Sequence, residues 1–236
     1  MKKLFVSLLS CLILVHFLST DKVFAQDDAY DPFIDYNEFE VADEEEADLN
    51  FFRNGRFLTA GFSLGQRSFT EGMGDVFDDD VVYGLYLSYF FDLRFALQFG
   101  YVTGSHAISV ASARGDTDIS GFSIDLKYYF NTQNVTKGLA SLNPYVIGGF
   151  TSFSRESVVD GQPEFSKDSA TGFDLGAGIE IPMMRNKMYF GAQAMYQLVN
   201  FKNENSEIIL DSGATPTGKF LTGDFITLLF ILGVNF

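Results

Sequence analysis

Residues 122–130 read FSIDLKYYF, and this stretch decides the fold of the chain. Apolar and aromatic side chains occupy every second position, while Ser123, Asp125 and Lys127 fall between them. A period of two indicates a β-strand, because successive side chains of a strand point to opposite faces of the sheet. One face of this strand is therefore apolar and the other is largely polar.

The same alternation recurs from Phe57 to the end of the chain. It predicts eight strands, at Phe57–Arg67, Val81–Phe91, Phe95–Thr103, Phe122–Phe130, Pro144–Phe153, Phe173–Ile181, Met188–Leu198 and Phe225–Phe236. The orientation of the fifth strand stays open, because Gly148 and Gly149 interrupt its pattern.

The apolar faces are too long and too uniform for the core of a small soluble barrel. Strands of about ten residues match the length that a tilted strand needs to cross a bilayer. A barrel closed on itself leaves no unpaired backbone in the hydrocarbon. The sequence thus predicts an all-β fold, an eight-stranded antiparallel up-and-down transmembrane β-barrel with apolar side chains outside and polar side chains in the lumen.

The connections between these strands alternate in length, as expected of short periplasmic turns and long outer loops. Asp92-Leu93 and Pro182–Lys187 are short. The predicted outer loops are Ser68–Asp80, Ser105–Asp118, Ser154–Thr171 and Lys202–Gly223. Asn131–Asn143 should be a short turn but is much longer, so its structure stays open.

The first 25 residues are predicted to be a secretory signal peptide. Lys2 and Lys3 precede an apolar run, and Val23-Phe24-Ala25 forms a cleavage pattern, so cleavage is expected near Ala25. Cys11, the single cysteine, lies within this run. An internal disulfide and a multi-cysteine zinc site are therefore excluded.

Residues 26–50 contain many acids and no base, so we expect a disordered periplasmic arm. A docking motif for a partner or a divalent-cation site is the alternative interpretation of this arm. Residues 51–236 remain for the barrel. The net charge of −15 repels phosphate, which argues against a nucleic-acid partner.

The C-terminal residues 228–236 read LLFILGVNF. This segment resembles the C-terminal insertion signal of bacterial outer-membrane proteins, in which apolar residues alternate before a final Phe. The matching residues are Leu228, Phe230, Leu232, Gly233, Val234 and Phe236.

Together with the signal peptide and the eight strands, residues 57–236 resemble the small OmpA/OmpX-type outer-membrane barrels. The resemblance implies location in the outer membrane of a Gram-negative bacterium, contact with outer-membrane lipids and assembly by the barrel insertion machinery. It implies no particular activity, because family members serve as adhesins, anchors, narrow pores and enzymes.

The candidate site is a polar cluster in the lumen. Its predicted members are Asp125, Lys127, Glu180, Gln98 and Gln193. Lys127 is the only base among the predicted inward positions, and an enclosed base needs a partner. We expect Lys127 to pair with Glu180 or Asp125; the alternative is that it extends to the periplasmic mouth and stays hydrated.

These features favour a structural or surface-interaction protein with a plugged lumen. A narrow channel for small or apolar solutes is the alternative, and a lipid-modifying enzyme is a third hypothesis. Ser105 and His106 are adjacent, so on a strand they would face opposite ways, and no third group is placed to orient the imidazole. We therefore expect His106 to be a polar residue of an outer loop, and we expect no enzymatic activity, cofactor or metal.

Overall fold

The computed structural model describes residues 57–92, 94–110, 113–130, 142–162, 165–184, 187–202, 204–210 and 213–236. The predicted signal peptide and the acidic arm lie outside these residues, and so does most of the connection Asn131–Asn143.

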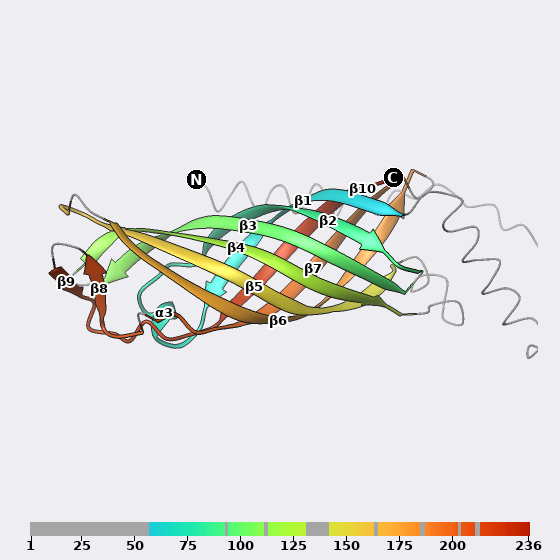
Figure 1. Cartoon of the computed structure of the whole chain (residues 1–236). Coiled ribbons are helices and arrows are strands. Elements are labelled where there is room, and N and C mark those ends of the chain that lie inside the picture. Colours follow the sequence, from blue (N-terminus) through green and yellow to red (C-terminus); the bar gives the residue numbers. More distant parts are fainter. Residues whose placement is uncertain are drawn as a thin grey trace, which may run out of the picture. The chain divides into compact units, whose positions relative to one another are not determined.

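Eight antiparallel strands form a closed barrel, which confirms the predicted fold class (Figure 1). The strands are β1 (Leu58–Phe69), β2 (Asp80–Phe90), β3 (Phe95–Val110), β4 (Ala113–Tyr129), β5 (Pro144–Val159), β6 (Phe165–Met183), β7 (Met188–Val199) and β10 (Phe225–Asn235). Each strand pairs with its neighbours along the chain, and β1 pairs with β10 from Thr59↔Asn235 to Phe69↔Phe225 to close the ring.

Two connections contain further elements. The short helix α3 (Glu71–Gly74) follows β1, and a hairpin of β8 (Glu207–Leu210) and β9 (Gly213–Pro216) precedes β10. None of the helices in the described residues is long and apolar enough to cross a membrane.

The alternation of the sequence sets the inside and the outside of the barrel. In β2, for example, Leu85 is 64% exposed on the outer face while its neighbour Tyr86 is buried in the lumen. The structure also orients β5, which the sequence left open: Tyr145 and Phe153 point inward, whereas Phe150 points outward.

The prediction that Ser105–Asp118 and Ser154–Thr171 are outer loops is wrong for most of their length. The chain stays extended there, with β3 and β4 paired up to Val110↔Ala113 and β5 and β6 paired up to Val158↔Phe165. In these extended parts of the strands the outward-facing residues are mostly polar. The alternation typical of a lipid-facing strand therefore ends, although the strand itself continues. A sheet with one wet face and one packed face alternates in this way.

The outer ends of β3, β4, β5 and β6 form one sheet, which we call the projecting sheet (residues 105–110, 113–118, 154–159 and 166–171). Figure 1 shows these four strands extending past β1, β2 and β7 toward the end that holds β8 and β9.

Two connections cover the inner face of the projecting sheet, and we call them the cap (residues 70–79 and the described residues of 201–224). The first connection is bound to β3 by the bridge Phe77↔Ile108 and by Asp78 N donating to Ala107 O at 2.9 Å. The two connections also bind each other, since Met73 N donates to Thr222 O at 2.9 Å.

Aromatic side chains gather at the opposite, periplasmic end of the barrel. Phe57 packs against Tyr89 with ring centroids 4.8 Å apart, and Phe95 packs against Tyr128 at 5.0 Å. Such a placement is typical of the aromatic girdle at a membrane boundary.

The last strand, β10, presents the predicted insertion signal to the outside: Phe230 is 61% exposed and Phe236 is 62% exposed. Gly233 faces inward, and a Cβ there would lie 2.4 Å from the ring of Tyr189. Phe236 also joins the barrel seam through its backbone, because its N–H donates to Leu58 O at 2.7 Å.

We expect Phe236→Ala to reduce insertion more than deletion of residues 26–50 does. The variant keeps the seam hydrogen bonds of residue 236 and removes only the outward ring. The measurement is the fraction of chains in the outer membrane whose gel mobility changes on boiling. Phe130→Ala removes another outward aromatic at the periplasmic end and is the control. If deletion of the arm were equally damaging, the arm would have a role in folding.

Candidate functional site

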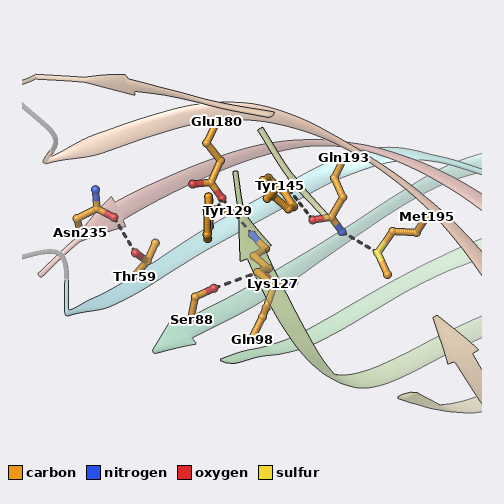
Figure 2. A network of polar contacts seen from close by, with 10 residues as sticks. All are labelled: Thr59, Ser88, Gln98, Lys127, Tyr129, Tyr145, Glu180, Gln193, Met195 and Asn235. Atoms are coloured by element: carbon orange, nitrogen blue, oxygen red, sulfur yellow. Dashed lines mark hydrogen bonds and ion pairs between the residues drawn. The ribbon is translucent and has the colours of Figure 1, made fainter. Parts of the chain in front are cut away.

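The layer of the lumen nearest the periplasmic end, which we call the lowest layer, is built around Lys127 of β4 and Glu180 of β6. Lys127 Nζ lies 3.1 Å from Glu180 Oε1, and the two side chains are 0% and 1% exposed. The Tyr129 hydroxyl donates to the same carboxylate oxygen at 2.9 Å, and the ammonium lies 4.4 Å from the ring centroid of Tyr145. Of the alternatives for Lys127, the structure therefore shows the pair with Glu180, enclosed rather than hydrated (Figure 2).

The two glutamines of the predicted cluster extend this layer to the neighbouring strands (Figure 2). The Tyr145 hydroxyl donates to Gln193 Oε1 at 2.8 Å, and Ser88 Oγ donates to Gln98 Oε1 at 3.3 Å. The layer thus joins side chains from β2 to β7.

Glycines on the adjacent strands, paired with the tyrosines in the register of the barrel, leave the space that the tyrosines occupy. A Cβ at Gly61 would lie 2.2 Å from the Tyr86 hydroxyl, and one at Gly178 would lie 2.4 Å from the Tyr145 hydroxyl. Any side chain at either glycine would displace a ring from the lumen.

Asp125 is separate from the Lys127 pair and belongs to a middle layer with Arg67 and Asp174. Thr151 Oγ1 and Gln197 Nε2 both donate to the Asp174 carboxylate, the latter at 3.0 Å. Arg67 Nη1 donates to a backbone oxygen, Ile119 O, at 3.1 Å. A cavity of about 40 Å³ lies in this layer, with room for a few water molecules.

The outer layer is the contact between the cap and the inner face of the projecting sheet. Phe225 is fully buried there, with its ring centroid 5.4 Å from that of Phe69 and 5.1 Å from that of Phe153. Arg155 pairs with Asp168 at 3.4 Å. Its guanidinium also lies 4.3 Å from the ring centroid of Phe201.

His106 also belongs to this outer layer, so the prediction that it is a residue of an outer loop is wrong. It lies in β3 with no exposed surface, Nδ1 is 3.2 Å from Asp78 O, and its ring packs edge-on against Phe69 at 4.7 Å. The reason is that β3 continues past the membrane with its even-numbered residues still pointing inward. Ser105, its neighbour, points outward and is exposed.

The predicted cluster omitted three charged residues of the lumen, Arg67, Asp174 and Arg155. The sequence contains a signal for the first two. Arg67 follows Ser63, and Asp174 precedes Glu180, at an even spacing on the same strand, so each pair points to the same face. Arg155 had no such signal, since it fell in the predicted outer loop Ser154–Thr171 and the orientation of the preceding strand was open.

Buried side chains occupy the interior in all three layers. The charges of the lowest layer are paired, and the outer layer is dominated by apolar rings. Within the part of the chain that the structure describes, no group of three or more His, Cys, Asp or Glu side chains could hold a metal ion.

The fold and its filled interior define a small membrane-spanning β-barrel. Residues 51–223 match the family described as the outer membrane protein beta-barrel domain, and the chain belongs to this family. Its location is therefore the bacterial outer membrane. A search of curated proteins gives no match.

Several solved outer-membrane barrels are similar in fold. Neisserial surface protein A has a TM-score of 0.53 at 12% identity, covering 76% of this chain and 97% of the other. The N-terminal barrel of OprF from Pseudomonas aeruginosa has a TM-score of 0.44 at 17% identity, covering 77% and 99%. The attachment invasion locus protein Ail of Yersinia pestis has a TM-score of 0.40 at 16% identity, covering 75% and 98%. Of these three, Neisserial surface protein A has a TM-score above 0.5, and at 12% identity it indicates a shared fold alone.

Proposed function

We propose that this protein is a plugged, non-conducting barrel of the outer membrane with a structural or surface-interaction role. The observation that supports the proposal most is that buried side chains occupy the lumen at three heights. An ion would have to pass the Lys127–Glu180 pair, then the Arg67–Asp174 layer, and then the buried rings around Phe225.

The projecting sheet is the surface proposed for interaction. Its outer face lies beyond the apolar band, is mostly polar and carries both signs of charge. The exposed polar residues on this face are Ser105, Ser109, Arg114, Asp116, Asp118, Lys167, Ser169 and Thr171. Because the cap holds the inner face, this outer face is supported as a rigid platform.

Planar-bilayer recordings of the purified protein test the closed lumen. We expect no steady conductance, because every path through the interior crosses all three layers. A reproducible single-channel conductance would contradict the proposal and favour the narrow channel instead.

Labelling of intact cells tests the exposure of the platform in the same preparation. Lys167→Cys should react with a membrane-impermeant maleimide, whereas Leu126→Cys, on the lipid-facing side of β4, should not. The only native cysteine lies in the predicted signal peptide, so each mature variant would carry one thiol. Failure of Lys167→Cys to react would remove the projecting sheet as an interaction surface.

A further inference from the structure

The Asp125 carboxyl is enclosed in the lumen without a good hydrogen bond. The residue is 1% exposed, and neither side-chain oxygen has a hydrogen-bond partner in the described part of the chain. Ser123 and Asp174 are close enough to interact with it, but neither reaches it with hydrogen-bond geometry. A buried ionised carboxylate in such a place would be costly.

Gly149 lets this carboxyl approach Asp174. In the register of the barrel, Gly149 pairs with Asp125 on one side and with Asp174 on the other. A Cβ at Gly149 would lie 2.5 Å from Asp125 Oδ1, so the Asp125 side chain occupies the space above the glycine. The two carboxyl groups therefore meet across three strands, with no side chain between them.

The two acids differ in their surroundings. Asp174 accepts hydrogen bonds from Thr151 and from Gln197, and Gln197 is itself held by Thr227 at 3.0 Å. These donors stabilise Asp174 as a carboxylate. Asp125 has no such donors, so it is the member of the pair that is better kept neutral.

The balance of charge points the same way. Lys127 forms an ion pair with Glu180 at 3.1 Å. Among the described residues, Arg67 is then the one cation in the middle layer for the two acids Asp125 and Asp174. Two carboxylates that share one enclosed site do not both ionise readily. If Asp125 and Asp174 were both ionised, they would need one more positive charge than Arg67 supplies.

We propose that Asp125 and Asp174 form a proton-binding site, in which Asp125 holds one proton next to the Asp174 carboxylate. A metal cation fits less well, because Arg67 lines the same small cavity and Lys127 lies two residues from Asp125 on the same face of β4. The charged and titratable groups that face the lumen around this site are Arg67, Tyr86, Lys127, Tyr145, Asp174, Glu180 and Tyr189.

Infrared spectroscopy of the full chain with isotope-labelled aspartate side chains tests the site directly. At neutral pH we expect the carbonyl band of an un-ionised carboxylic acid, equivalent to one carboxyl per chain. Asp125→Asn should abolish this band. Asp118→Asn, an exposed position of the same strand, should leave it unchanged. Absence of the band from the wild-type protein, or its loss on adding sodium or calcium ions, would overturn the proposal.

Unfolding in urea provides a second readout. The folded chain would hold a proton that the unfolded chain releases at neutral pH, so wild-type stability should fall as the pH rises. Above about pH 5, where a free aspartate is ionised, the slope should approach one proton for as long as the folded chain keeps its proton, a tenfold change in the unfolding equilibrium per pH unit. Asp125→Asn cannot bind this proton and should lose the slope.

Equal slopes in the wild type and Asp125→Asn would count against the proposal. If Asp125→Asn fails to fold, the wild-type spectrum alone decides. Neither measurement depends on whether the barrel conducts ions.

Discussion

Replacing Lys127 by methionine should lower the free energy of unfolding by about 3–5 kcal/mol, because it leaves the Glu180 carboxylate buried without its cation. Glu180 is 1% exposed, and the Tyr129 hydroxyl, which donates to the same carboxylate, is neutral. The measurement is the urea unfolding transition of the purified barrel in detergent, with single-channel conductance recorded in parallel. We expect the conductance to stay near that of the wild type, since the middle and outer layers remain.

Two variants serve as controls for Lys127→Met. Lys167→Met removes a cation that lies 4.0 Å from Glu156 on the surface, with side chains 65% and 42% exposed. That pair should contribute less than about 1 kcal/mol. Lys127→Met combined with Glu180→Gln should recover most of the loss, because no unpaired charge remains. A loss for Lys127→Met no greater than that for Lys167→Met would reject the buried pair as a stabilising plug.

Replacing Phe225 by alanine should also cost about 3–5 kcal/mol of unfolding free energy, since it opens a cavity in close-packed surroundings. Phe225 has no exposed surface and contacts the rings of Phe69 and Phe153, with the Arg67 guanidinium 5.2 Å from its centroid. The change removes the side chain at which the cap, the projecting sheet and the middle layer meet. Urea unfolding and protease sensitivity of the cap connections measure the effect.

Phe122→Ala is the matched control for Phe225→Ala. Phe122 is 51% exposed on the lipid-facing side of β4, so its truncation leaves no enclosed cavity. We expect a clearly smaller loss of stability and no change in cap proteolysis. Similar losses for the two variants would mean that the rings around Phe225 are not close-packed in the folded protein.

Part of this structure could be predicted without coordinates, because the relevant signal is local. A strand side chain lies on the opposite face from its two neighbours, so the alternation in FSIDLKYYF assigns each residue to lipid or lumen. The same rule, applied to eight segments, predicted the closed barrel and the inward direction of Lys127. The rule ended each predicted strand where the outward face became polar. It therefore ended β3 too early and assigned His106 to a loop.

The amino-acid sequence by itself determined the strands, the faces and the class of barrel. The tertiary structure alone decided which lumen groups meet: Lys127 with Glu180, Asp125 with Asp174 across Gly149, and the cap with the projecting sheet. The physical reason is that contacts across the lumen depend on strand register and ring closure, which bring together residues far apart in the chain. No local period in the sequence encodes those distances.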